Sequence, residues 1–347
     1  MTGRVTGRRA AVLAVDGGNS KTDVALVGDD GSVLGYARGP GSCHQTIGVP
    51  ATLDVLTRLV RLAAAQAGLA ASGPVARCGA FYLAGADLPV EVTMLAEHLR
   101  AAGWTEEVTV DNDTFALLRA GSERPDRVAV VCGAGINCVG LSASGAVVRF
   151  PSLGRLSGDW GGGAQLAAEA LWLAIRAEDG RGEATALRPA VAAHFGLSSV
   201  TAVAAAIHLG QLPGERLHEL VPVLFRVAEE GDDAARAVVL RMAREVALMA
   251  TVALRRLGLM GTAADVVLGG GVLAARNPLL LGTVLEELAA AAPYARPVVV
   301  DQPPVVGAAL LGLDGLHAPH RVEDHLRDAL LRTMGERVAA ARVGARW

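Results

Sequence analysis

The stretch AVLAVDGGNSKTD, residues 11–23, decides how the rest of the chain is interpreted. A near-continuous apolar run, typical of a buried strand, leads into a Gly-Gly turn that carries Asp16, Asn19, Lys21 and Thr22. Lys21 is the only lysine in the chain. A compact ammonium group beside exposed turn amides suits a phosphate. The turn is therefore a candidate phosphate site, and the alternative is a hairpin tip with an ordinary surface lysine.

The residues that follow this turn predict strands rather than a helix. Residues 23–27 and 32–37 are apolar runs separated by the turn signal Asp29-Asp30-Gly31. A P-loop and a dinucleotide-binding fingerprint each need their own glycine spacing, and each leads into a helix. Neither spacing is present here. If the turn holds phosphate, it does so through the backbone amides of a hairpin.

The same pattern returns over residues 127–150. An apolar strand at 127–132 leads into a second glycine turn, 133–137 (GAGIN), and two further strands follow at 138–142 and 145–150. Strand, glycine turn, strand, turn and strand therefore occur twice, which indicates an internal duplication. Such a duplication would place the two glycine turns opposite each other across a cleft.

The remaining segments alternate between helix and strand in the first half and are mainly helical in the second, as expected for mixed sheets flanked by helices. Asp232 or Asp233 is expected to cap the long helix of the second half. Helices are predicted over about 50–69, 89–102, 111–121, 164–177, 184–195, 199–210, 216–230, 233–258, from about 278, and over 304–313 and 321–342, with further strands at 78–84, 106–110, 265–268 and 297–300.

Composition narrows the class of protein. The 347 residues suffice for two lobes, and a net charge of −3 with a pI of about 6.3 provides no basic field for nucleic acid. No run of 18 apolar residues predicts a membrane span, and Asp16 interrupts the apolar run that follows the first arginines, so no signal peptide is expected. The four cysteines form no metal-ligand or disulfide pattern, which favours a reducing cytoplasm.

A late turn, LGGGV at 268–272, completes a set of motifs that resembles the actin, sugar kinase and Hsp70 ATPase superfamily. Within it, the chain from about 11 to 315 is similar to the BadF/BadG/BcrA/BcrD ATPase family. The resemblance implies an α/β, duplicated ribonuclease H-like (actin-like ATPase) fold. It also implies an N-terminal lobe at 1–121, a C-terminal lobe at 122–316, and a C-terminal helix at 317–347 that could pack back on the first lobe.

The resemblance also implies ATP and Mg²⁺ as cofactors, with Asp16 near the metal. The implied nucleotide-binding residues are Asp16, Gly17, Gly18, Asn19, Lys21 and Thr22 in the first phosphate motif, Gly133, Ala134, Gly135 and Asn137 in the second, and Gly269, Gly270 and Gly271 in the adenosine motif. Phosphoryl transfer needs mainly positioning and charge neutralisation, which backbone amides and a divalent cation can supply.

A carboxylate base is expected in the stretch VDNDTFA, residues 110–116. In similar kinases the carboxylate at the position of Asp113 accepts the proton from the sugar hydroxyl. Asp111 is an alternative base, and a further alternative is that Asp113 only caps the helix that begins there.

The sugar site departs from the family pattern. Where N-acetylglucosamine kinases carry a sugar-binding asparagine this chain has Cys43, which cannot replace both the donor and the acceptor of an amide, so His44 and Gln45 are the candidates to take over. The segment GDWGGG at 158–163 resembles the GDEGS segment of those kinases, so Asp159 is a candidate ligand of sugar hydroxyls, while Trp160 replaces an acidic residue.

The function that these motifs predict is phosphorylation of an amino sugar by ATP, with N-acetylglucosamine 6-phosphate as the product. Glucosamine or another hexosamine is an alternative substrate, as are other hydroxyls of the sugar. Two other classes remain open: an ATPase activator of an acyl-CoA dehydratase, whose iron–sulfur ligands the cysteine spacing does not match, and a silent sugar sensor. Only ten residues precede the first strand, too few for the DNA-binding segment of sugar-responsive repressors. A cytoplasmic homodimer is expected.

Overall fold

The computed structural model describes residues 9–70, 73–319 and 321–344, with the side chains of 321 and 336–344 left aside. The first eight residues, weighed above as the start of a signal peptide, lie outside this range. The chain divides into two compact units. Unit 1 comprises residues up to Glu123 together with those from Asp301 onward, and unit 2 is Arg124–Val300.

Unit 1 is built on a mixed sheet of five strands in the order β3-β2-β1-β4-β5. Its central strand β1 pairs antiparallel with β2 and parallel with β4. The three-stranded opening predicted from the sequence is present. The strands are β1 (Ala10–Gly17), β2 (Lys21–Val27), β3 (Val33–Pro40), β4 (Ala76–Leu83) and β5 (Thr105–Asp111).

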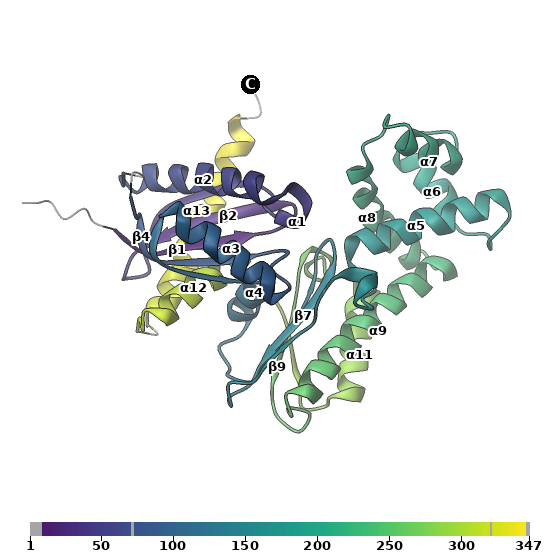
Figure 1. The fold of residues 1–347 in the computed structure, drawn as a ribbon. Helices are drawn as coiled ribbons and strands as arrows, with labels where there is room; N and C mark the ends of the chain where they lie inside the picture. The colour runs from purple at the N-terminus through teal and green to yellow at the C-terminus, as the bar shows by residue number, and fades with distance from the viewer. Residues whose placement is uncertain (1–8, 71–72, 320, 345–347) are drawn as a thin grey trace, which may run out of the picture. The chain divides into compact units, whose positions relative to one another are not determined.

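Helices cover both faces of this sheet, with α2 and α3 on one face and α12 with α4 on the other (Figure 1). Side chains alternate between the faces along β1, so Leu13 and Val15 join the core under α2 and α3 while Val12 meets α12. The helices are α1 (His44–Ile47), α2 (Val49–Gln66), α3 (Pro89–Ala102), α4 (Asp113–Gly121), α12 (Pro304–Gly315) and α13 (Arg321–Gly344).

The return of the chain to unit 1 at Asp301 differs from the predicted lobe boundary at 316. Two glycines explain why α12 belongs to unit 1. A Cβ at Gly307 would lie 1.7 Å from the carbonyl oxygen of Ala116 on α4, and one at Gly312 would lie 2.4 Å from Val12. These bare backbone positions let α12 pack closely on both α4 and the sheet. The following helix, α13, contacts β3 and α12.

Unit 2 repeats the sheet of unit 1 strand for strand. Its order is β10-β9-β6-β7-β8, and its central strand β6 pairs antiparallel with β7 and parallel with β9. This shared topology confirms the predicted internal repeat. The strands are β6 (Arg127–Cys132), β7 (Ile136–Leu141), β8 (Val147–Arg149), β9 (Asp265–Gly269) and β10 (Arg296–Val299).

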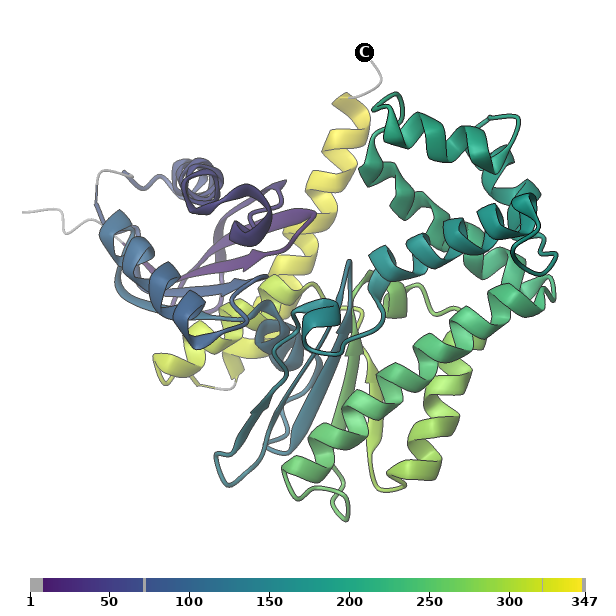
Figure 2. The ribbon, with the colours of Figure 1, turned by 45° about the vertical axis from the view of Figure 1, so that its right-hand side comes forward.

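A large helical insert separates β8 from β9, and Figure 2 shows its last helix, α9, lying alongside α11. Asp232 caps α9, because its side chain accepts the N–H of Ala235 at 2.9 Å. The helices are α5 (Gly162–Asp179), α6 (Leu187–His194), α7 (Val200–His208), α8 (Leu220–Glu229), α9 (Asp233–Arg256), α10 (Gly271–Ala274) and α11 (Pro278–Ala291), with 3₁₀ turns at η1 (Gly154–Leu156) and η2 (Gly214–Glu219).

The helix predicted over 216–230 is split into η2 and α8. Pro222 lacks the N–H that would bond to the carbonyl of His218, so a regular α-helix cannot extend far toward the N-terminus of that proline. Across the described residues, none of the helices combines the length and the apolar character needed to cross a bilayer.

Candidate functional site

The first glycine turn and the predicted sugar loop, the segment after β3 that contains Cys43, His44 and Gln45, form one structure in unit 1. The N–H of Gly18 donates to the carbonyl of Lys21 at 2.9 Å, and the N–H of Ser42 donates to the carbonyl of Gly18 at 3.0 Å. Gly41 lies so close to the turn that a Cβ there would be 1.9 Å from the carbonyl oxygen of Asn19. The hydroxyl of Thr22 donates to that of Ser42 at 2.8 Å. The turn therefore fixes where the sugar loop begins.

Lys21 lies beside the buried carboxylate of Asp23. Its Nζ is 3.7 Å from Asp23 Oδ2, and half of its side chain is exposed (50%). Asp23 has other partners, because Arg38 donates to both of its oxygens at 2.6 and 2.9 Å, and the Tyr36 hydroxyl donates to Oδ1 at 2.5 Å. Asp23 thus holds two cationic groups near the turn.

Asp16, the last-but-one residue of β1, is a buried carboxyl group among other carboxylates. Burial raises its pKa well above the usual value, the charges of Asp113 and Asp23 raise it further, and Lys21 and Arg38 oppose them. A cation would relieve this repulsion, so the chemistry of the position fits Mg²⁺. The described side chains include no group of three His, Cys, Asp or Glu that could hold a metal. Mg²⁺ is commonly bound by one or two carboxylates together with substrate phosphates.

Asp113 is the first residue of α4, and the cap of that helix is its neighbour. The side chain of Asn112 accepts the N–H of Thr114 at 2.9 Å, which is the N-cap hydrogen bond. Asp111 instead accepts the N–H of Asn112 at 2.7 Å. Asp113 is therefore not needed to cap α4.

The surroundings of Asp113 favour its protonated form. Burial is the main reason that its pKa is raised to about 7, the charge of Asp87 adds to this, and the N–H groups of Asp113 and Thr114 oppose it. A carboxyl group whose pKa is near neutrality is suited to accept a proton during catalysis.

The three sugar-loop candidates differ in what they can offer a ligand. The thiol of Cys43 is buried against Gly85, where an added Cβ would lie 3.0 Å from its sulfur. The Nε2 of Gln45 donates to Glu91 Oε1 at 2.8 Å. The His44 side chain is only 8% exposed, its Nε2 lies 3.6 Å from the same Glu91 oxygen, and its Nδ1 finds no hydrogen-bond partner within the described part of the chain. His44 Nδ1 is thus a buried polar atom that no described group satisfies.

Two acidic residues of this region, Asp87 and Glu91, were missed by sequence reasoning. Asp87 follows the carboxyl end of β4, and Glu91 lies in the first turn of α3. Glu91 also accepts the N–H groups of Asp87 and Leu88 at 3.2 and 2.9 Å. The available signal was position, since polar groups just beyond the carboxyl ends of parallel strands gather at one edge of a sheet, where ligands bind in such folds.

In unit 2 the second glycine turn is supported by the start of α5. The N–H of Gly163 donates to the carbonyl of Gly133 at 2.8 Å, and the N–H of Ala164 donates to that of Ala134 at 2.9 Å. At Gly162 the backbone has φ +81°, and a Cβ there would lie 2.4–2.5 Å from the backbone of Gly135. Space above the turn is open, because a Cβ at Gly133 or Gly135 would meet no described atom within 4 Å.

The Gly269–Gly271 turn is packed against the strand that carries the second glycine turn. Gly269 ends β9, and a Cβ at Gly270, whose φ is +85°, would lie 2.4 Å from the carbonyl of Cys132. Gly133 follows directly after Cys132, so the two glycine turns of unit 2 are neighbours. At the far side of the second turn, Asn137 accepts the N–H of Cys138 at 2.6 Å through its own side chain.

Asp159 and Trp160 have different surroundings. The carboxylate of Asp159 accepts the Ser157 hydroxyl at 2.5 Å within the loop that precedes α5. Trp160 is buried, and the Arg241 guanidinium lies 4.1 Å from the centre of its ring. All four cysteines of the chain are free thiols and buried.

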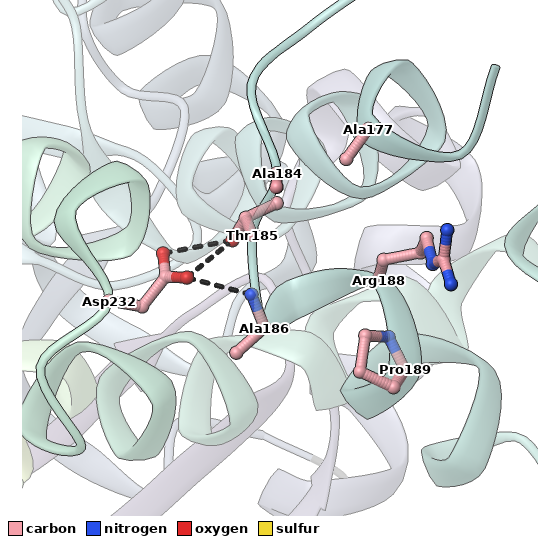
Figure 3. A pocket seen from close by; sticks show the side chains of 7 residues that line it. All are labelled: Ala177, Ala184, Thr185, Ala186, Arg188, Pro189 and Asp232. Atoms are coloured by element: carbon pink, nitrogen blue, oxygen red, sulfur yellow. Dashed lines mark hydrogen bonds between the residues drawn. The ribbon is translucent and has the colours of Figure 1, made fainter. Parts of the chain in front are cut away.

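A pocket of about 410 Å³ in the helical insert of unit 2 contains none of the predicted site residues. Figure 3 shows the carboxylate of Asp232 turned toward Thr185 and the backbone nitrogen of Ala186, while Arg188 points away from it. Because Asp232 also caps α9, its carboxylate joins the start of α9 to the segment that precedes α6.

The chain is similar to known proteins over most of its length. The model of the BadF/BadG/BcrA/BcrD ATPase family matches residues 13–312. The N-acetylmuramic acid/N-acetylglucosamine kinase of Clostridium acetobutylicum is 25% identical over 266 residues, which are 76% of this chain and 85% of that protein. The N-acetyl-D-glucosamine kinase of Dictyostelium discoideum is 21% identical over 314 residues, covering 87% and 97%.

A solved structure has the same fold. It belongs to a candidate N-acetylglucosamine kinase of Chromobacterium violaceum, and its TM-score with this chain is 0.68 at 23% identity, covering 88% of this chain and 99% of that one. This likeness confirms the predicted α/β, actin-like ATPase fold class.

Proposed function

Because this chain belongs to the BadF/BadG/BcrA/BcrD ATPase family, we propose that it is a carbohydrate kinase that uses ATP to phosphorylate an amino sugar, N-acetylglucosamine, at its 6-hydroxyl. The observation that carries the proposal is in unit 1, where Asp113 begins α4 without capping it and its charge acts on Asp16 beside the first glycine turn. A proton acceptor and a phosphate turn are the two parts that this reaction needs. The names of both curated relatives include N-acetylglucosamine kinase, and this supports the choice of sugar.

In the proposed mechanism, Asp113 accepts the proton of the sugar hydroxyl as the hydroxyl oxygen bonds to the γ-phosphorus of ATP. The bond from that phosphorus to the bridging oxygen breaks, and ADP leaves with the electron pair. Mg²⁺, held by Asp16 and the phosphates, would neutralise charge on the transferred group. The amides of the first turn and Lys21 would bind phosphate oxygens of ATP.

The amides of the second turn, Gly133–Asn137, would contact the other phosphates of ATP. The open backbone at Gly271 would leave room for the adenosine, since a Cβ there would meet no described atom within 4 Å. Gln45, Asp159 and the free Nδ1 of His44 would bind sugar groups.

The sugar is tested by measuring ADP release from purified protein with Mg²⁺ and ATP. The panel comprises N-acetylglucosamine, N-acetylmuramic acid, glucosamine, N-acetylmannosamine and glucose, and ³¹P NMR locates the phosphate in each product. We expect the highest kcat/KM with N-acetylglucosamine and a 6-phosphate product. Sugar-independent ADP release, or none with any sugar, would contradict the proposal. A preference for glucosamine or another hexosamine would support the kinase activity but assign it a different substrate.

We also propose that the protein is a cytoplasmic homodimer. The free, buried state of its four cysteines accords with a reducing compartment. An apolar side chain available for self-association is Leu248, which is 57% exposed on α9. Light scattering coupled to gel filtration should give twice the chain mass of 35.5 kDa, and a value equal to that mass would contradict the dimer.

A further inference from the structure

Asp87 lies between the sugar loop and the start of α4 and bonds to both. Its Oδ1 accepts the side-chain N–H of Asn112 at 2.8 Å, and its Oδ2 accepts the side-chain N–H of Gln45 at 3.3 Å. The same nitrogen of Gln45 lies 3.2 Å from the carbonyl oxygen of Gly85, two residues before Asp87. One carboxylate therefore joins two segments that are far apart in the sequence.

Each bond of this network has a fixed direction. Asn112 is 3% exposed, and its side-chain oxygen is occupied by the N–H of Thr114, so its nitrogen is the end that must face Asp87. Gln45 also presents a nitrogen. A carboxylate accepts hydrogen bonds and donates none, which makes it the side chain that can satisfy two donors at once.

Asn112 passes the effect of Asp87 to the next residue. As the N-cap, Asn112 fixes the backbone where α4 begins, and Asp113 is the first helical residue. A rotation of the Asn112 amide that loses the cap would also change the direction of the Asp113 side chain.

We propose that Asp87 is a positioning residue that fixes the position of the sugar loop relative to Asp113. The inference rests on the proposed function, because it takes Asp113 as the base and Gln45 as a sugar ligand. In this proposal Asp87 acts through Asn112 and Gln45 and not on the transferred phosphate or the attacking hydroxyl. A displacement of a reacting group by about 1 Å can lower a rate by about 100-fold, so fixing the sugar loop relative to Asp113 has a measurable effect on the rate.

The decisive variants reverse donor and acceptor in the hydrogen bond between the side chains of residues 87 and 112. Asp87→Asn leaves one acceptor oxygen where the donors of Asn112 and Gln45 converge, so whichever way the new amide turns, an N–H faces one of them and the link between the two segments is broken. We expect kcat to fall by about 10- to 100-fold and the KM for the sugar to rise, with the KM for ATP unchanged. In the double variant Asp87→Asn/Asn112→Asp, the new amide donates to residue 112, which still caps α4, while its oxygen accepts from Gln45. Most of the lost kcat should return.

Two further variants separate positioning from general damage. Glu91→Gln disturbs Gln45 and His44 on the sugar-loop side without touching Asn112, so it should raise the sugar KM and lower kcat much less than Asp87→Asn does. Asp232→Asn removes a carboxylate that also joins two segments, in the insert of unit 2, where it caps α9 itself, and should leave both constants unchanged. If the exchange restores nothing, or if Asp87→Asn changes only the sugar KM, Asp87 does not position the base.

A readout without turnover keeps this inference separate from the proposed function. Hydrogen exchange followed by mass spectrometry, on full-length protein without sugar, should show faster exchange over residues 43–48 and 111–118 in Asp87→Asn. In Glu91→Gln, residues 43–48 and the start of α3, whose N–H groups Glu91 accepts, should change, while residues 111–118 should not. Unchanged exchange over 111–118 in Asp87→Asn would overturn the coupling. A wild-type protein that phosphorylates no sugar would overturn the proposed function alone.

Discussion

At the scale of single residues, Asp113 is distinguished by its place in the helix as well as by its pKa. Asn112 performs the capping and Asp111 accepts a backbone N–H, so the carboxyl group of Asp113 is available for chemistry. This difference between three adjacent polar residues leads to a direct comparison of their variants.

Replacing Asp113 by Asn should abolish proton acceptance while preserving size and shape. We expect kcat to fall by about 10²- to 10⁴-fold, and the Kd for ATP, measured by calorimetry, to stay close to the wild-type value. Asp111→Asn is the matched control, because it changes a neighbouring carboxylate that already accepts a backbone N–H. Equal losses in both variants would argue against Asp113 as the base.

The rate should depend on pH through the same group. With a pKa of about 7, Asp113 is mostly protonated, and so unable to accept a proton, at lower pH. The value of kcat/KM should therefore rise with pH up to about 7 and then level off, with a limiting slope of about tenfold per pH unit below it. The profile is measured at a fixed excess of Mg²⁺. A rate independent of pH between 5 and 8 (roughly the range that brackets this pKa) would contradict the assignment.

The residues of the site could be predicted only in part, and the reason is distance along the chain. The glycine turns and the stretch around Asp113 are local patterns, and the structure gives each of them a defined geometry. Asp87 and Glu91 have no local pattern, since their roles depend on partners such as Gln45 that are more than 40 residues away. The free Nδ1 of His44 likewise depends on tertiary packing.

At the scale of secondary structure, helices and strands are predicted correctly where the spacing of hydrophobic residues alone identifies them. The strands of both sheets and the long helices α2, α3 and α9 are found close to their predicted limits. The sequence does not predict the short helix α1, because four residues are too few to show a period. The unit to which α12 belongs could not be predicted either, since it depends on which helix faces Gly307.

Gly307 gives a test of how α12 packs. In Gly307→Ala the added Cβ would collide with the carbonyl oxygen of Ala116, so α12 and α4 must separate, at a cost of about 1–3 kcal/mol or more. The control is Gly315→Ala in the same helix, where a Cβ would meet no described atom within 4 Å. Urea denaturation should show a lower midpoint for the first variant and an unchanged or higher one for the second. A Gly307→Ala protein as stable as wild type would contradict the packing described here.

At the scale of the whole molecule, the two units differ in how the chain builds them. Unit 2 is one continuous segment, whereas unit 1 needs residues from both ends of the chain. In unit 1 the strand β1 packs against α12, which lies beyond the whole of unit 2 in sequence. The units should therefore respond differently to being separated.

Expression of the two units apart tests this expectation. Residues 124–300 should unfold cooperatively on their own, because they contain their complete sheet and core. Residues 1–123 should aggregate, while the same segment joined by a flexible linker to 301–347 should remain in solution and fold, as judged by circular dichroism. A stable, folded 1–123 fragment would show that α12 is dispensable.

The position of α12 also has a consequence for synthesis on the ribosome. When residue 123 has been made, the face of the β1 sheet that α12 will cover is still bare, and it stays so until residues 124–315 have followed. At about 5–20 residues per second this delay is on the order of ten seconds or more. During that time the nascent N-terminal sheet exposes an apolar surface that a chaperone could bind before α12 does. The rate at which the ribosome translates the unit 2 segment sets how long this surface stays exposed.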